Sequence, residues 1–301
     1  MNSSFKGHAC VIFTVIMWGL TFISTKILLN DFSSVEILFD RFLLAYLASY
    51  LIVPKFKKVT SVKDEFVLMM AAFFGVDLYF IFENAALFYS YASNVSVLVS
   101  TAPLFTALVN RFIGDKSPLK PHFLFGFVLA ISGTVFLCFS SFELHLNPLG
   151  DAMAVCSAVS WAGYTMCIKY LYNKGYRSAP MTKGMLFYSV LLCLPIMLFA
   201  GYDLKIPQLV KPVNIFNFVF LSVICSTVCF ITWNLSVKLL GAIRSSIYLY
   251  ALPVVTAIGA VIILNERPTV YTLLGIFLIT CGLVISQNYH LPLFRKLKLV
   301  R

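Results

Sequence analysis

Long apolar segments alternate with short polar breaks along the whole chain of 301 residues. Each apolar segment covers roughly 18 to 24 residues, enough for a helix to cross about 30 Å of hydrocarbon. Leu, Ala, Met and Phe fill these segments without the period-two alternation of a membrane barrel. The pattern predicts an all-α polytopic membrane protein of ten transmembrane helices, at residues 8–29, 36–53, 66–84, 89–113, 122–140, 149–171, 183–200, 214–236, 242–264 and 271–288.

The two halves of the chain repeat each other. Trp18 and Lys26 match Trp161 and Lys169, each pair eight residues apart, and matched Asn, Ala, Pro and Gly residues follow in both halves. Such a repeat is typical of secondary transporters, and five helices per repeat is an odd number, so the second repeat is inverted relative to the first. We therefore expect two five-helix repeats at residues 8–140 and 149–288, followed by a basic tail at 289–301.

Composition and charge place the chain in a lipid bilayer. Hydrophobic residues make up 60% and charged residues 12% of the chain, about half the charged fraction of a soluble domain. The net charge of +11 comes mainly from Lys and Arg after even-numbered spans and in the tail, with Lys205, Lys211 and Arg267 as exceptions. The positive-inside rule then predicts a multi-pass protein of the cytoplasmic membrane, with both termini in the cytoplasm. We expect the first span to be a retained helix, the tail to contact anionic lipid and no nucleic acid to bind.

Motifs for metal, cofactor or enzymatic chemistry are missing from the sequence. The eight cysteines lie in or at the ends of spans without a C-x-x-C pair, and the four histidines lie at span ends, far apart in sequence. There is no H-E-x-x-H, G-x-S-x-G or Walker sequence. We expect no metal, no cofactor and no enzyme, and an ATP-driven pump is excluded.

Several short motifs point to one family. They are Trp18-Gly19-Leu20-Thr21-Phe22 with Lys26, Arg41-Phe42, Pro253, and Asn265-Glu266-Arg267-Pro268 with Gly275 and Gly282. Together with the duplicated ten-span layout, the chain resembles the EamA family of the drug/metabolite transporter superfamily over nearly its whole length. The resemblance implies alternating access by a carrier that moves small metabolites outward without ATP, often amino acids or related solutes.

Polar residues inside the predicted spans are the candidates for a solute site. Asp77 lies roughly 17 Å from the cytoplasmic end of span three, where a buried carboxylate costs about 3 kcal/mol. It could couple transport to protons or bind a cationic amine, or else form a polar bond between helices. Asn94 and Thr101 share one face of span four, and Arg244 and Tyr248 occupy the equivalent face of span nine. These residues could line a cavity between spans three, four, eight and nine, or hold helices together.

Other polar residues have simpler interpretations. Arg41 could receive a solute carboxylate, but we prefer pairing with Asp40 and phosphate headgroups. Lys26 and Lys169 are expected to extend to headgroups, and Asn84 and Asn234 to cap helix C-termini.

Pro103 and Pro253 lie at matching depths in spans four and nine. Proline removes a backbone hydrogen bond and bends a helix, so both are candidate hinges. Matched hinges favour a secondary active transporter over the alternative, a non-transporting scaffold or sensory subunit. A channel is disfavoured because no ring of like charges recurs along the spans. The expected partners are the bilayer, a small solute and protons as candidate coupling ions. The small-residue stripe at Gly150, Ala154, Ala158 and Ala162 suits close helix packing either within the chain or with a second copy of it in a homodimer.

Overall fold

The computed structural model describes residues 3–54, 61–90, 92–113, 121–139, 147–199, 201–263 and 270–287. The predicted basic tail and the Asn265-Glu266-Arg267-Pro268 motif lie outside these ranges. The described residues form helices joined by short connections, which confirms the all-α prediction. The first repeat contains α1 (Ser3–Leu28), α2 (Ser34–Ile52), α3 (Val62–Ala72), η1 (Phe73–Leu78), α4 (Tyr79–Tyr89), α5 (Ala92–Val99), α6 (Ala102–Phe112) and α7 (Pro121–Phe139).

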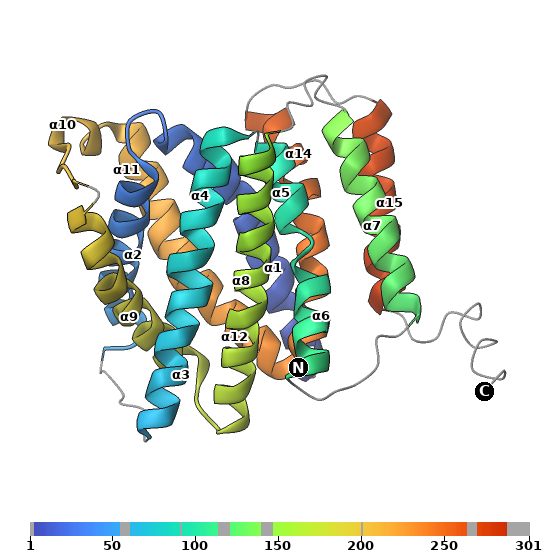
Figure 1. Ribbon diagram of the computed structural model, residues 1–301, viewed down its shortest axis with the longest axis horizontal. Coiled ribbons are helices and arrows are strands. Elements are labelled where there is room, and N and C mark those ends of the chain that lie inside the picture. Colours follow the sequence, from blue (N-terminus) through green and yellow to red (C-terminus); the bar gives the residue numbers. More distant parts are fainter. Residues whose placement is uncertain are drawn as a thin grey trace.

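The second repeat follows the same order. It contains α8 (Pro148–Asn173), α9 (Ser178–Phe199), the short α10 (Ile206–Leu209), α11 (Pro212–Val219), η2 (Phe220–Val228), α12 (Cys229–Leu240), α13 (Ala242–Ile247), η3 (Tyr248–Ala251), α14 (Leu252–Ile263) and α15 (Val270–Gln287). Because α3–η1–α4, α5–α6, α11–η2–α12 and α13–η3–α14 each form one span, the described residues form ten spans. The first helices of the two repeats, α1 and α8, run in opposite directions (Figure 1), so the repeats are inverted.

Five helical stretches of the described chain are long and apolar enough to cross a membrane: Ser4–Leu28, Val62–Tyr89, Ser178–Phe199, Pro212–Leu240 and Ala242–Ile263. The other spans do not combine this length with this hydropathy within the described residues. Many of the large apolar side chains on the outside of the bundle are exposed, such as Leu51, Phe199 and Phe277. This is the surface expected of a protein whose solvent is lipid.

Irregular helix segments occur at equivalent places in the two repeats. The π-helical segments η1 and η2 interrupt the third and eighth spans, and π-turns inside helices are frequently found at functional sites. Span four is interrupted between α5 and α6, just before Pro103, and span nine contains the 3-10 segment η3 just before Pro253. The two prolines lie in the first turns of α6 and α14. Proline is tolerated in a first turn because its missing N–H would be unpaired there. The sequence predicted the irregularity at the prolines but not the π-helical segments.

The last helices of the two repeats, α7 and α15, lie side by side at one edge of the bundle (Figure 1). Glycines let their backbones approach closely. A Cβ atom on Gly133 would lie 2.7 Å from the carbonyl oxygen of Gly275, and one on Gly282 would lie 2.6 Å from that of Gly126. The glycines that match between the two halves of the sequence therefore contact each other, Gly133 with Gly275 and Gly126 with Gly282, between α7 and α15.

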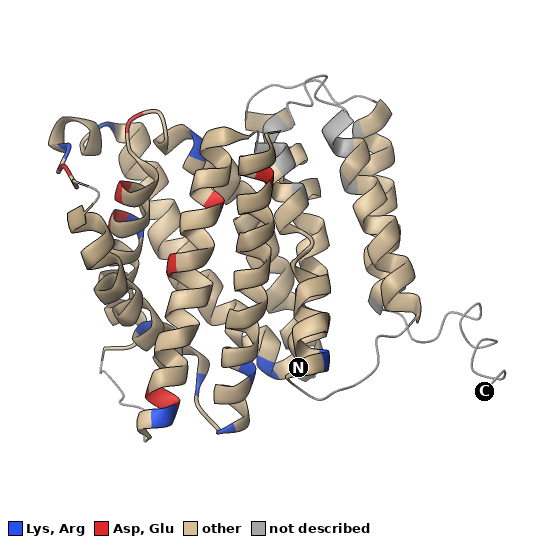
Figure 2. Ribbon diagram, in the orientation of Figure 1, with Lys and Arg blue, Asp and Glu red and all other residues tan. Residues whose placement is uncertain are grey.

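The charges divide the molecule into two faces. Lys and Arg gather at the face where the N-terminus lies, here called the basic face (Figure 2). Lys26 lies on the opposite face as well. Two further cations of that face are paired with acids, Lys205 with Glu36 at 2.9 Å and Lys211 with Asp31 at 2.8 Å. The described chain ends at α15 on the basic face as well. From this distribution the positive-inside rule predicts that the basic face is cytoplasmic.

The orientation predicts a labelling pattern. In a chain without native cysteines, Asp203→Cys on the face opposite the basic one should react with an impermeant thiol reagent applied to intact cells. Asn173→Cys, at the basic end of α8, should react only after the membrane is opened. Both positions are exposed, so the reverse pattern would invert the topology, and equal labelling of both would contradict the span count.

Four polar side chains have roles other than those predicted. The ammonium group of Lys26, which was expected to extend to a headgroup, donates a 2.8 Å hydrogen bond to the carbonyl of Leu87, near the C-terminus of α4. A positive charge is favourable there because the helix dipole is negative at its C-terminus. Lys169 likewise donates to the Asn110 side chain, at 2.8 Å. Asn84 and Asn234 lie inside α4 and α12 and are not C-caps.

Candidate solute-binding site

The two equivalent tryptophans of the repeats touch each other. The rings of Trp18 and Trp161 are perpendicular, with centroids 5.0 Å apart. Trp233 of α12 packs behind both, with centroids 5.3 Å from Trp18 and 5.4 Å from Trp161. Because Trp18 and Trp161 are related by the duplication, the pseudo-two-fold axis passes between them. Solute sites of inverted-repeat proteins lie at this interface near the middle of the membrane.

A cavity of about 20 Å³ lies beside the two tryptophans, which is room for about one water molecule. Its apolar wall is formed by Phe22, Phe80, Val99, Ala102, Leu249 and Leu252. The lining comes from spans one, two, three, four, six and nine. The prediction of a cavity between spans three, four, eight and nine was therefore wrong in part, because span eight does not line the cavity. It lies behind the lining, where Trp233 and Phe230 pack against Trp18 and Trp161.

Arg41 brings a positive charge to the cavity. Its side chain is 2% exposed, and its Nε donates a 2.7 Å hydrogen bond to the hydroxyl of Ser226 in η2. The guanidinium carbon lies 4.3 Å from the ring centroid of Phe80, within range of a cation–π contact. Asp40 instead accepts a hydrogen bond from Tyr202. The preferred interpretation, in which Arg41 pairs with Asp40 and headgroups, was wrong.

Glu83 of α4 brings a negative charge to the same cavity. It is 2% exposed and lies one turn after Tyr79, which also lines the wall. Neither Oε2 of Glu83 nor Nη2 of Arg41 has a hydrogen-bond partner among the described residues. Buried charged atoms without partners are costly. A bound solute could therefore supply the hydrogen-bond partners that these two atoms lack.

Glu83 is not among the predicted site residues, because the predicted span three ends at residue 84 and places Glu83 at the end of the helix. The helix continues through Ala85-Ala86-Leu87-Phe88-Tyr89, so Glu83 lies six residues inside it. Arg41 lies seven residues inside α2, counted from the start of α2, which is on the same membrane face as the end of α4. At about 1.5 Å per residue both side chains lie roughly 10 Å deep. If the predicted span three had extended to residue 89, Glu83 would have been placed at the depth of Arg41, and the two charges could have been predicted to share a site.

Asp77 is buried, as expected, but faces away from the described cavity. Its Oδ1 accepts a 3.0 Å hydrogen bond from Ser189 of α9, and its Oδ2 has no described partner. Its repeat equivalent, Thr227, bonds the carbonyl of Ala45 at 2.9 Å. Both side chains thus join a π-helical segment to a neighbouring helix, and a coupling role for Asp77 stays a prediction.

The other predicted site residues surround the broken spans. The Thr101 hydroxyl donates to the carbonyl of Leu98 at 2.6 Å, within the break between α5 and α6. Tyr248 contacts His8 of α1 at 2.6 Å, and Arg244 is exposed near the basic face. The side chain of Asn94 lies outside the described part of the structure. Thr101, Arg244 and Tyr248 do not line the described cavity, whereas Ala102 and Leu252, directly before the two prolines, do.

An inverted ten-helix bundle with a charged and aromatic cavity at the repeat interface is the architecture of a multi-pass membrane transporter. The model of the EamA-like transporter family matches residues 5–139 and 148–287. The chain belongs to this family, which confirms the resemblance seen in the motifs.

Relatives of similar length carry only general names. An uncharacterized transporter of Archaeoglobus fulgidus is 28% identical over 95% of this chain and 98% of its own length. The uncharacterized transporter YcxC of Bacillus subtilis is 25% identical over 94% and 92%. A crystal structure of a protein 17% identical in sequence superposes with a TM-score of 0.72 over 95% of this chain and 98% of its own, and shows the fold alone.

Proposed function

We propose that this transporter exports a small zwitterionic metabolite, such as an amino acid, across the cytoplasmic membrane by alternating access. The observation that carries the proposal is the presence of Arg41 and Glu83 in the lining of one cavity, each with a buried atom that has no described hydrogen-bond partner. A zwitterion offers a carboxylate to the guanidinium and an ammonium group to the carboxylate. Hydrogen bonds to charged groups are the strong ones, especially where water is excluded.

The rest of the wall supports an apolar or aromatic solute side chain. The Nε1 of Trp161 also lacks a described hydrogen-bond partner and can serve as a second donor to the carboxylate. A cavity of about 20 Å³ is too small for a metabolite. Binding therefore requires the repeats to move apart, and the breaks before Pro103 and Pro253 are proposed as the hinges.

Solute exchange in vesicles tests the proposal. Purified protein is placed in vesicles loaded with one unlabelled compound, and uptake of a labelled apolar amino acid is measured. An amino acid inside should accelerate uptake, whereas the matching carboxylic acid without the amine and the matching amine without the carboxylate should not. Absence of exchange with any compound of a broad metabolite panel would favour the scaffold or sensory alternative, and equal exchange with all three would refute the charge pairing.

A further inference from the structure

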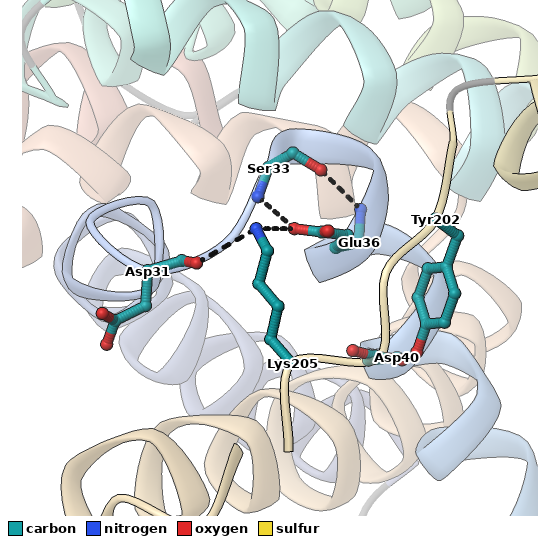
Figure 3. A network of polar contacts seen from close by, with 6 residues as sticks. All are labelled: Asp31, Ser33, Glu36, Asp40, Tyr202 and Lys205. Carbon is teal, nitrogen blue, oxygen red and sulfur yellow. Dashed lines mark hydrogen bonds and ion pairs between the residues drawn. The ribbon is translucent and has the colours of Figure 1, made fainter. Parts of the chain in front are cut away.

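The face opposite the basic one is crossed by a network of polar contacts between the two repeats (Figure 3). Lys205, which precedes α10, extends between α1 and α2 of the other repeat. Its ammonium nitrogen lies 2.9 Å from Oε2 of Glu36 and 3.4 Å from the carbonyl oxygen of Asp31. The same Glu36 oxygen accepts a 2.6 Å hydrogen bond from the backbone N–H of Ser33, which fixes the acceptor at the start of α2.

Two further contacts join the same segments. The Asp31 carboxylate accepts hydrogen bonds from Lys211 at 2.8 Å and from Asn214 at 2.7 Å, and these bonds hold the pKa of Asp31 below its ordinary value. The hydroxyl of Tyr202 donates to Asp40 at 2.8 Å. We call this set the clasp; its residues are Asp31, Glu36, Asp40, Tyr202, Lys205, Lys211 and Asn214. All of its contacts join the connection after α1, or the first two turns of α2, to the segment that runs from Tyr202 to the first turn of α11.

The duplication places a related contact on the basic face. Asn214 in the first turn of α11 corresponds to Asp64 in the first turn of α3, since the offset is 150 residues. The Asp31 connection corresponds to the connection between α8 and α9, which contains Tyr176. The hydroxyl of Tyr176 donates to Asp64 at 2.9 Å, and that of Tyr170 donates to the other oxygen at 3.0 Å.

The two equivalent contacts differ in chemistry. The clasp contains two ion pairs, whereas the described contact of Asp64 on the basic face uses neutral tyrosine donors. Attraction between partly exposed charges weakens with added salt, but a bond from a neutral hydroxyl depends on salt far less. Both contacts are formed in this structure, in which the central cavity holds no more than about one water molecule.

We propose that the clasp is the latch that closes the central cavity toward the face opposite the basic one. This proposal rests on alternating access, in which inverted repeats exchange conformations and equivalent contacts open in turn. The clasp then opens in one access state and the Tyr176–Asp64 contact in the other. Each exposed ion pair is weak alone. Two of them suffice to shift a balance between states that are close in free energy.

Thiol labelling of the cavity tests the latch without any solute. The probe is Val99→Cys in the cavity wall of a chain without native cysteines, and the reagent is an impermeant methanethiosulfonate cation. Lys205→Gln with Lys211→Gln should accelerate labelling from the clasp side about three- to tenfold, from the loss of two partly exposed ion pairs. The matched control, Lys6→Gln with Arg111→Gln, removes two exposed cations from the basic face and should leave the rate unchanged.

Two further variants keep the test decisive. Exchanging the charges as Asp31→Lys with Lys211→Asp should keep labelling slow, because the pair is rebuilt. Tyr176→Phe should accelerate labelling from the basic face only. An unchanged rate in the lysine double variant, or equal acceleration from both faces, would overturn the latch. If that variant does not fold, an unchanged rate in the Val99→Cys chain between about 0.1 and 1 M salt would overturn it instead. A failure of solute exchange would leave these rates unaffected.

Discussion

Replacing Arg41 by Ala should weaken solute binding roughly ten- to a hundredfold. Charged hydrogen bonds contribute about 1.5 to 3 kcal/mol each, and every 1.4 kcal/mol is a factor of ten in affinity. Arg41→Lys should recover only part of the loss, because an ammonium group cannot keep the Ser226 bond and reach the solute with a planar fork. Binding is measured by the dissociation constant of a labelled amino acid in detergent or vesicles.

A matched variant separates the lost contact from general damage. Lys183→Gln also removes a buried cation, one that is 1% exposed and donates to the carbonyl of Val53 at 2.7 Å, but it lies outside the cavity lining. It should leave the dissociation constant unchanged at equal thermal stability. If Arg41 holds the carboxylate, the affinity difference between the amino acid and its decarboxylated amine should vanish in Arg41→Ala. Persistence of that difference would place the carboxylate elsewhere.

The architecture could be predicted because its signals are long and repeated. Ten apolar segments and the spacing of Trp18 and Lys26 against Trp161 and Lys169 carry information that survives errors of several residues at helix ends. The inversion follows from an odd number of helices. The ion pairs of Lys205 and Lys211 could not be predicted from the sequence, because the partners Glu36 and Asp31 lie about 170 to 180 residues away along the chain.

The site could be predicted only in part, because a sequence gives the depth of a residue and not the direction in which it points. Asp77 was correctly expected to be buried, yet its helix turns it toward Ser189 and away from the described cavity. Arg41 was judged by its sequence neighbour Asp40, whereas rotation of α2 sends the two side chains to different partners. Glu83 was lost through an error of five residues at one helix end.

Asp77→Asn should yield a carrier that folds and exchanges solute but no longer accumulates it against a gradient. Asparagine keeps the oxygen that accepts from Ser189, so the contact between η1 and α9 survives while the titrating proton is lost. A carboxyl group near the membrane midplane can take up a proton from one side and release it to the other. The measurement is the ratio of internal to external solute in vesicles under an imposed pH gradient, compared with exchange at equal pH.

Glu83→Gln provides the contrast, because it alters the other buried carboxyl of the same span. Since Glu83 lines the cavity, its loss should weaken exchange itself and remove the preference for the amino acid over the matching carboxylic acid. If Asp77→Asn keeps the concentrative ratio and the pH profile of the unaltered chain while Glu83→Gln loses both, then Glu83 couples the proton and binds the ammonium group, and Asp77 only joins two helices. If neither variant changes the pH profile, proton coupling through this span is refuted.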